Sequence, residues 1–348
     1  MNILTPFDQT GLLPHGGRLQ TVAAQFAIPL EQWLDLSTGI NPNGWPVKEL
    51  PASAWVRLPE EEDGLPAVAC RYYGADCLLP VAGSQAAIQS LPLLRVPARV
   101  SVLHPGYAEH AHAWQRNHHR VTAVAPDQIE QAIPSTDVLV IIHPNNPTGA
   151  VFPVATLLDW HAQLAERGGW LIVDEAFMDA TPEFSLAAYA TRPGLIVLRS
   201  LGKFFGLAGA RVGFVCAQPT LLKQLNHLLG PWTVNTPARW AAAQALQDIL
   251  WQKETRRNLL IAGNRLKTLL THHQLPPAGG CALFQWVISR HAAELCNELA
   301  SQGILVRYLN DPPSLRFGLP AHEPDWQRLD RALAPIHRRF SGYSRSTP

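Results

Sequence analysis

Four polar residues in the middle of the chain each follow a short apolar run, and together they could do chemistry. Asn146 follows VLVII in the segment HPNNPTG, and Asp174 follows WLIV in VDEAF. Lys203 follows LIVL in RSLGKFFG, and Arg211 stands shortly after it in GLAGARVGF. An amide, a carboxylate, an amine and a guanidinium at the ends of parallel strands would converge at the sheet edge where α/β proteins bind ligands.

These groups match the requirements of pyridoxal 5'-phosphate (PLP), an electron-withdrawing cofactor. Its pyridine nitrogen must stay protonated, which needs a facing carboxylate, and its aldehyde needs a lysine amine. Its phosphate needs backbone N–H groups, hydroxyls and an arginine. Each residue alone has an ordinary explanation, such as a helix cap for Asp174, a solvated charge for Lys203 or a turn for NNPTG. Their combination, in this order and with Asn146, Asp174 and Lys203 about thirty residues apart, favours the PLP interpretation.

Alternating apolar runs and helical stretches between residues 78 and 216 predict the sheet that positions these groups. The runs are of strand length and rich in Val, Ile and Leu, as expected for strands buried on both faces. They are Val100–Leu103, Val138–Ile142, Trp170–Val173, Leu195–Leu198 and Val212–Val215. The clearest helix is predicted from Pro153 to Arg167, because its apolar residues follow the helical period and glycines follow it. We therefore expect a mostly parallel α/β sheet flanked by helices.

The pattern changes after Pro231 and predicts a smaller α+β domain. The expected elements are two helices between Thr236 and His272 (the second from near Thr255), a strand at Cys281–Ser289, a helix at Ala292–Gln302, a strand pair at Ile304–Val306 and Ser314–Phe317, and a last helix from Asp325. The predicted domains are an N-terminal arm (1–40) that joins the small domain, a large PLP-binding domain (41–254), the small domain (255–340) and a flexible tail (341–348).

The composition is that of a globular enzyme. A chain of 348 residues is long enough for roughly two domains. Lys and Arg (28) balance Asp and Glu (27), which argues against a nucleic acid or an acidic membrane surface as partner. Five scattered cysteines without a CxxC pair predict reduced thiols in the cytoplasm and no metal site. The N-terminus lacks the features of a signal peptide, and the apolar stretch Leu195–Cys216 contains too many basic residues for an ordinary membrane span.

The segments PNNPTG, VDEAF, SLGK and GARVGF together resemble the fold-type-I PLP enzymes of the aspartate aminotransferase superfamily, over roughly residues 35–319. The resemblance implies that Lys203 forms the Schiff base with the cofactor and moves protons. It implies that Asp174 pairs with the pyridinium and that Asn146 binds the ring hydroxyl. The other implied cofactor contacts are Ser200 and Arg211 at the phosphate, helped by Gly83, Ser84 and Gln85 in VAGSQAAI, and a stacking ring, Tyr107 in HPGYAEH.

The N-terminal region points to one branch of this superfamily. HGGRLQ at His15–Gln20 and WLDLSTGINPNGWP at Trp33–Pro46 are similar to the threonine-phosphate decarboxylases of cobalamin biosynthesis, which are related to histidinol-phosphate aminotransferases. The later segments PGYAEH, VLRSLGKFFGLAG and GPWTVN also match this branch. The substrate-binding residues that it implies are His15, Gly16, Gly17, Asn41 and Arg316. Arg316 would grip the substrate carboxylate, and the HGG segment would close over the substrate and meet its phosphate or carboxylate.

The reaction that the resemblance implies is decarboxylation of L-threonine O-3-phosphate to (R)-1-amino-2-propanol O-2-phosphate and CO2, by a homodimer with its sites at the subunit interface. A decarboxylase must hold the Cα–carboxylate bond of its substrate perpendicular to the cofactor ring, whereas a transaminase holds the Cα–H bond there. Side-chain geometry decides between the two, and the sequence does not show it.

Two positions depart from the pattern of related aminotransferases. Those enzymes often carry Tyr-Pro-Asp, whose Tyr reaches the partner subunit's cofactor phosphate, where this chain has Leu58, Pro59 and Glu60. A Tyr that bonds the ring hydroxyl often follows the Asp-Glu-Ala triplet, where this chain has Phe177. Asn146 would then act alone on the ring hydroxyl, and the transaminase interpretation is weakened more than the PLP interpretation.

Two other functions are considered. One is an aminotransferase that acts on histidinol phosphate or a similar amine. The other is a regulator that uses this fold as a ligand sensor. Such regulators resemble fusions with an N-terminal helix-turn-helix domain, whereas only about 35 residues, not basic in character, precede the fold here. We therefore expect an enzyme.

Overall fold

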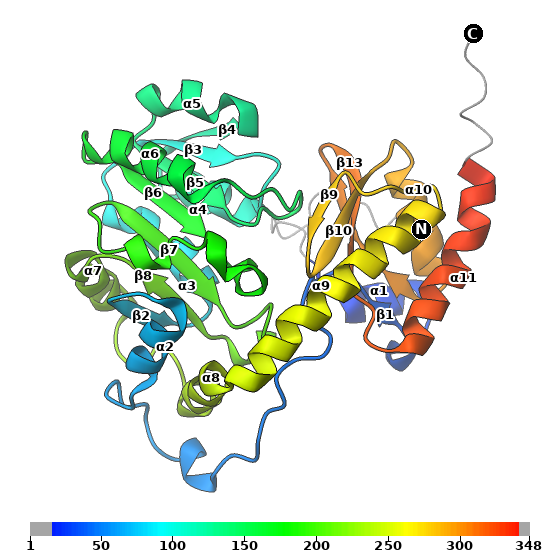
Figure 1. Cartoon of the computed structure of the whole chain (residues 1–348), viewed down its shortest axis with the longest axis horizontal. Coiled ribbons are helices and arrows are strands. Elements are labelled where there is room, and N and C mark those ends of the chain that lie inside the picture. Colours follow the sequence, from blue (N-terminus) through cyan, green and yellow to red (C-terminus); the bar gives the residue numbers. More distant parts are fainter. Residues whose placement is uncertain (1–15, 341–348) are drawn as a thin grey trace. The chain divides into compact units, whose positions relative to one another are not determined.

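The computed structural model describes residues 16–340, which divide into two units (Figure 1). The small unit contains the described residues up to Asn43, the segment Pro147–Gly149 and the chain from Asn258 onward. The large unit contains Gly44–Asn146 and Ala150–Arg257. The chain thus divides after residues 43 and 257, where the sequence predicted divisions after 40 and 254. The predictions for His15 and for the tail 341–348 lie outside the described residues.

The large unit is built on a mixed sheet that has seven strands within the described residues, in the order β2-β8-β7-β6-β5-β3-β4. These strands are β2 (Leu78–Val81), β3 (Arg99–Leu103), β4 (Arg120–Val124), β5 (Val138–Ile142), β6 (Trp170–Asp174), β7 (Leu195–Ser200) and β8 (Gly213–Cys216). The strands from β4 to β7 are parallel, and β8 is antiparallel to both of its neighbours. The sheet is therefore mostly parallel, as predicted, and the carboxyl ends of β5, β6 and β7 lie at one edge.

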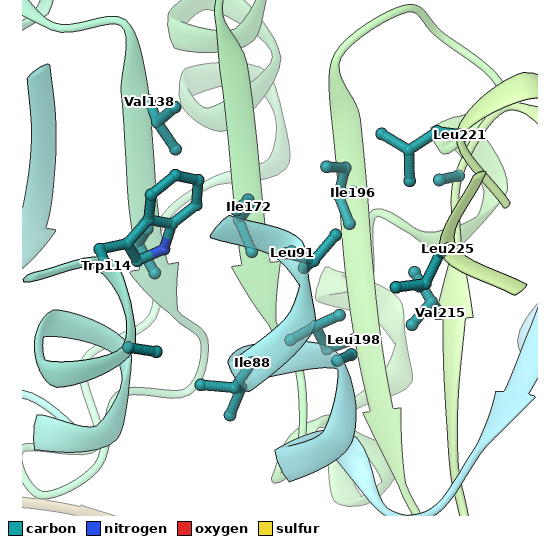
Figure 2. Packing of buried hydrophobic residues seen from close by; sticks show 14 of the residues in the cluster. Ile88, Leu91, Trp114, Val138, Ile172, Ile196, Leu198, Val215, Leu221 and Leu225 are labelled. Atoms are coloured by element: carbon teal, nitrogen blue, oxygen red, sulfur yellow. The ribbon is translucent and has the colours of Figure 1, made fainter. Parts of the chain in front are cut away.

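Helices on one face of this sheet bury its apolar side chains (Figure 2). Ile172 of β6 and Ile196 of β7 belong to this cluster. They pack against Ile88 of α3 (Ser84–Ser90) and against Leu91, which directly follows α3. Trp114 of α4 (Ala108–Arg116) covers the β5 side of the cluster, and Leu225 of α7 (Pro219–Leu229) covers the β8 side. Full burial of one such side chain contributes roughly 1.5–3 kcal/mol, so this cluster anchors the strands that end at the candidate site.

The large unit contains other α-helices, and the sequence predicted bounds only for the one after Pro153 and the one from Thr236. These other helices are α2 (Leu65–Tyr73), α5 (Ile129–Ala132), α6 (Val154–Ala165) and α8 (Thr236–Gln247), while α9 (Ile249–His272) runs across the division at Arg257. In α6 the buried residues Leu157, Trp160, His161 and Leu164 lie on one face at helical spacing. Pro153 precedes the helix. Gly168 follows it with a φ of 67°, a left-handed conformation that glycine adopts without strain.

The small unit combines short sheets with helices. Its elements are α1 (Leu19–Phe26), β1 (Leu34–Asp35), β9 (Gly279–Cys281), β10 (Phe284–Ile288), α10 (Ala292–Ser301), β11 (Ile304–Leu305), β12 (Arg307–Asn310), β13 (Pro313–Gly318) and α11 (Glu323–Phe340). β12, β13, β10 and β9 form an antiparallel sheet, and β1 pairs with β11 in parallel. Val22 and Ala23 of α1 pack against Trp33, Ala300 and Leu305, which holds the N-terminal region in this unit.

Three predicted elements differ from the structure. The long helix α9 starts at Ile249 instead of near Thr255, because Asp248 caps it by accepting the N–H of Trp251. The predicted strand Cys281–Ser289 is a hairpin in which Cys281 of β9 pairs with Phe284 of β10, and no Gly or Pro marks its turn. The predicted partner of β13 was Ile304–Val306, but Ile304 pairs with Leu34 instead and β12 pairs with β13.

Candidate active site

The predicted phosphate-binding residues gather around two glycines of the large unit. A Cβ on Gly83, whose φ is 73°, would lie 2.6 Å from Nη2 of Arg211, so the guanidinium packs directly on this glycine. A Cβ on Gly213 would lie 2.5 Å from the backbone nitrogen of Ser84. Gly213 also pairs with Ser200 across β7 and β8. The two missing side chains let the Arg211 guanidinium and the Ser84 N–H approach these glycines closely, beside the strand position of Ser200. We call this group the glycine cradle; an N–H group, a hydroxyl and a guanidinium are the donor set that binds phosphate.

Asp174 ends β6 as a buried carboxylate with an organised set of donors. Its Oδ2 lies 2.9 Å from Nε2 of His110, and its Oδ1 accepts the N–H of Ala176 at 3.1 Å. Both side chains of the His110–Asp174 pair are almost fully buried. Because a carboxylate only accepts, the imidazole donates through Nε2 to this oxygen.

Tyr107, the predicted stacking residue, stands at the start of α4 and is tied to α3. Its hydroxyl donates to Oε1 of Gln85 at 3.2 Å. The amide of Gln85 in turn donates to the buried carboxylate of Glu109 at 2.8 Å, and Gln89 donates to the same oxygen at 2.9 Å. The Tyr107 ring also meets the His110 ring edge to face. The first turn of α4 therefore contacts two of the predicted cofactor residues, Gln85 and Asp174.

Lys203 and Asn146 follow the carboxyl ends of β7 and β5, as predicted, and both are partly buried. The Lys203 Nζ lies 5.3 Å from the centroid of the Phe177 ring, within the range of a cation–π contact. Phe177, the departure from the aminotransferase pattern, thus offers the lysine an apolar face where a Tyr would offer a hydroxyl. Asn146 belongs to the large unit, while the next three residues group with the small unit.

A buried ionic cluster joins the strands that carry Asp174 and Ser200. Arg199 precedes Ser200 and donates to Glu175, the residue after Asp174, and to Asp179 at 2.7 Å. All three side chains are buried, and burial raises the pKa of the Glu175 carboxyl. Since successive residues of extended chain point to opposite faces, this cluster lies behind the cofactor-facing side chains. It clamps the ends of β6 and β7 together.

The predicted substrate residues that the structure describes lie in the small unit, and Gly16, Gly17 and Arg316 contact Ser37. The guanidinium of Arg316 on β13 donates to the Ser37 carbonyl and stacks over Phe284 at 5.2 Å. The N–H of Gly17 donates to Ser37 Oγ at 3.0 Å, and Gly16 packs against the Ser37 backbone. Asn41 is buried, and its side-chain oxygen accepts the Asn43 N–H at 3.0 Å.

The residues of the large unit fit PLP as a cofactor. A larger side chain at Gly83 or Gly213 would displace the Arg211 guanidinium or the Ser84 backbone, and the donors of the glycine cradle suit a phosphate. The buried Asp174 carboxylate is the acceptor that a protonated ring nitrogen would need, and the Lys203 side chain carries the amine that the aldehyde would need. This chemistry was predicted from the sequence, and the structure adds the packing that brings Gly83 and Arg211 together.

Sequence reasoning missed His110, Glu109 and Ser37. His110 could have been found, because it stands three residues after Tyr107 in HPGYAEH, a spacing that places two residues on one face of a helix. Glu109 and Ser37 carry no comparable signal, since their roles depend on partners from distant parts of the chain.

Residues 69–334 match the sequence profile described as aminotransferase class I and II. The chain belongs to the class I and II aminotransferase family. The chain is similar to the threonine-phosphate decarboxylase of Pseudomonas aeruginosa. The two are 56% identical over 92% of this chain and 97% of the relative's length. The fold agrees with that of this family of PLP-dependent enzymes, as predicted.

Two solved structures show the same fold at low sequence identity. The histidinol-phosphate aminotransferase of Sinorhizobium meliloti, in complex with pyridoxal-5'-phosphate, has a TM-score of 0.83 at 18% identity and covers 97% of this chain and 98% of its own. The L-threonine-O-3-phosphate decarboxylase of Porphyromonas gingivalis has a TM-score of 0.76 at 20% identity, with coverage of 87% and 99%. Among residues 16–340 of this chain, no helix is long and apolar enough to cross a membrane.

Proposed function

We propose that this protein decarboxylates L-threonine O-3-phosphate to (R)-1-amino-2-propanol O-2-phosphate and CO2 with PLP as cofactor, as a step of cobalamin biosynthesis. The observation that carries the proposal is the 56% identity to a threonine-phosphate decarboxylase, which extends over nearly the whole of both chains. The buried Asp174, the amine of Lys203 and the glycine cradle supply the groups that this chemistry needs.

Residues of the large unit hold the cofactor. The N–H groups of Gly83, Ser84 and Gln85, the Ser200 hydroxyl and the Arg211 guanidinium bind its phosphate. Tyr107 packs on its ring, Asn146 binds the ring hydroxyl, and Asp174 keeps the ring nitrogen protonated with support from His110. When bound, PLP withdraws the electron pair that is left at the substrate Cα when a bond to that carbon breaks.

The reaction further needs control over which bond breaks and where the proton goes. Arg316 grips the substrate carboxylate, while Asn41 and the segment His15–Gly17 orient the rest of the molecule. The carboxylate leaves as CO2, and protonated Lys203 Nζ then delivers a proton to Cα in its place, which leaves the lysine as a neutral amine. Phe177 suits this role because its ring contacts the Lys203 amine without competing for its hydrogen bonds.

The proposal includes a homodimer. The large unit exposes apolar side chains on two segments. These segments are neighbours, because the carbonyl of Arg57 accepts a hydrogen bond from the Thr236 hydroxyl of α8. The exposed apolar residues near Arg57 are Trp55, Val56 and Leu58. The one near Thr236 is Trp232. Ile249 and Leu250, just after α8, are also exposed. Exposed apolar groups of this kind mark protein interfaces, and a second copy of the chain is the partner that we propose.

A cytoplasmic location is part of the same proposal. Cys70, Cys77, Cys216, Cys281 and Cys296 are all free thiols in the structure. Reduced cysteines are typical of the cytoplasm, where glutathione and thioredoxin keep thiols reduced.

The test is incubation of the purified PLP-loaded protein with L-threonine O-3-phosphate. We expect CO2 and aminopropanol phosphate in equal amounts without added 2-oxo acid, and no product with Lys203→Ala. Lys223→Ala, a change on α7, serves as the control and should remain active. Amino transfer to 2-oxoglutarate from histidinol phosphate, without release of CO2 from threonine phosphate, would establish the aminotransferase alternative instead.

A further inference from the structure

Ser37 occupies a rigid position in the small unit. The N–H of the preceding residue, Leu36, donates to Leu305 at 2.8 Å, and its carbonyl accepts the N–H of Gly318 at 2.7 Å. This residue therefore bridges β11 and the end of β13. Ser37 itself is 1% exposed, so its backbone and side chain are held inside the unit.

The Ser37 hydroxyl uses both its donor and its acceptor capacity. Its O–H and its backbone N–H both donate to Oδ1 of Asp35, at 2.6 and 2.8 Å. The hydroxyl oxygen then accepts the N–H of Gly17 at 3.0 Å. Because Asp35 fixes the direction of the O–H bond, the lone pairs that receive the Gly17 N–H are fixed too.

Gly16 contacts the same residue from its backbone side. A Cβ on Gly16 would lie 2.6 Å from the Ser37 carbonyl oxygen, closer than real side chains approach. Only a glycine therefore fits here. Gly16 thus has a packing reason in the structure, because it lies on the Ser37 carbonyl. Gly17 has a conformational reason, because its φ is 82° where its N–H binds the Ser37 hydroxyl.

The same Ser37 carbonyl accepts a hydrogen bond from the guanidinium of Arg316. Arg316 is 5% exposed, and Phe284 covers one face of its guanidinium. A planar guanidinium has five N–H donors in a fixed fork. A backbone acceptor at one of its nitrogens therefore determines the direction in which the remaining donors point.

We propose that Ser37 is a positioning residue that sets both the Arg316 guanidinium and the Gly16–Gly17 segment, and thereby places the substrate carboxylate. The inference rests on the proposed function, in which Arg316 and the HGG segment bind the substrate. It goes further by naming the residue that couples them, and it changes the role of Gly17. The N–H of Gly17 already serves Ser37, so Gly17 contributes through the shape of the segment that it fixes.

The test compares Ser37→Ala with Ser314→Ala in the PLP-loaded protein. Ser314 is the matched control because it is also fully buried, lies on β13 close to Arg316, and donates its hydroxyl to the Pro312 carbonyl at 2.8 Å. Loss of either hydroxyl removes a buried hydrogen bond, but only Ser37→Ala removes the acceptor of the Gly17 N–H.

The first measurement is hydrogen–deuterium exchange without substrate, followed in peptides that contain Gly17. We expect about tenfold faster exchange in Ser37→Ala and no change in Ser314→Ala. The second measurement is steady-state kinetics with threonine phosphate. A net loss of about 1 kcal/mol corresponds to a rise of roughly fivefold in KM, and we expect kcat and the Kd of PLP to change little.

Ser37→Cys is the second variant, because its thiol is close in size and is a weaker acceptor, and intermediate effects are expected. Unchanged exchange at Gly17, or faster exchange with an unchanged KM, would overturn the proposal. Equal effects of Ser37→Ala and Ser314→Ala would also overturn it, since they would indicate stability alone. If the unmodified protein releases no CO2 from threonine phosphate, the proposed function fails, while the exchange experiment still decides whether Ser37 holds Gly17.

Discussion

At the scale of single residues, Asp174 depends on a partner that comes from another element. Its carboxylate lies beside the His110 imidazole in a buried environment, where an ion without hydrogen bonds would be unfavourable. The imidazole N–H donates to this carboxylate, which faces the cofactor ring nitrogen in the proposed function. His110 supports the chemistry through Asp174.

The variant His110→Phe is expected to weaken PLP binding. Phe fills a similar volume but offers no N–H to Asp174 Oδ2, and a hydrogen bond to a charged group contributes about 1.5–3 kcal/mol. The Kd of PLP should rise roughly tenfold to a hundredfold, measured by titration of the cofactor absorbance. The control is His112→Phe, on the same helix. Equal Kd values for the two variants would contradict the assignment.

His143, next to the Asn146 loop, is expected to make stability depend on pH. Burial lowers the pKa of His143 to about 4, from an ordinary value of about 6.5. The unfolded chain therefore binds more protons than the folded protein between these values. The stability from this group is fully present above pH ~6.5 and is lost by about 1.4 kcal/mol per pH unit as the pH falls toward 4.

The measurement is the change in Tm between pH 7 and pH 5. It should be smaller in His143→Gln, which cannot titrate, than in the unmodified protein. His272→Gln, a change of an exposed histidine, serves as the control and should keep the full change. The explanation fails if His143→Gln loses as much Tm as the unmodified protein.

At the scale of elements, the turn between β2 and α3 sets the phosphate cradle. In Gly83→Ala the new Cβ would meet the Arg211 guanidinium, and the φ of 73° would be strained as well. We expect a clear loss of PLP affinity, measured as the Kd of the cofactor. Gly64→Ala is the matched control, because its φ of 84° gives similar strain while a Cβ there meets nothing within 4 Å. It should lower Tm but leave the Kd of PLP unchanged.

Arg199, Glu175 and Asp179 form the ionic clamp between β6 and β7. We expect loss of its arginine to lower the free energy of unfolding strongly. Arg199→Ala leaves the buried carboxylates of Glu175 and Asp179 without their cation, and breaking a buried ion pair in this way costs about 3–5 kcal/mol. Arg99→Ala removes an exposed ion pair with Asp137 on the same sheet and should cost less than about 1 kcal/mol. Denaturant unfolding measures both. Similar losses would show that the clamp does not stabilise the sheet.

At the scale of the whole molecule, the proposed homodimer predicts a native mass twice that of one chain in light scattering. The double variant Val56→Asp and Leu250→Glu places charges on side chains that are 84% and 81% exposed in the single chain. It should shift the protein toward the monomer, because burying unpaired charges in an interface is unfavourable. Val96→Asp, at an 80% exposed position elsewhere, is the control and should stay dimeric. A native protein of single-chain mass would exclude the dimer.

The sequence by itself determined the α/β class, the strand that ends in Asp174 and the strand that Lys203 follows. These features are local: an apolar run of strand length and the polar residue after it lie within a few positions of each other. The motifs that resemble the family, PNNPTG, VDEAF, SLGK and GARVGF, lie in the same local segments. Local signals were weaker where a turn lacks Gly or Pro, as between β9 and β10, and where strand partners had to be chosen, as for Ile304.

Only the tertiary structure decided which residues serve these groups. His110 reaches Asp174, Arg211 packs on Gly83, and Ser37 joins Gly17 to Arg316. Each of these contacts joins residues that are far apart in the chain, so it depends on how strands and helices pack, and a local pattern does not encode it. The chemistry could thus be predicted from residue types at strand ends, whereas the groups that hold and orient the reacting residues became visible only in the fold.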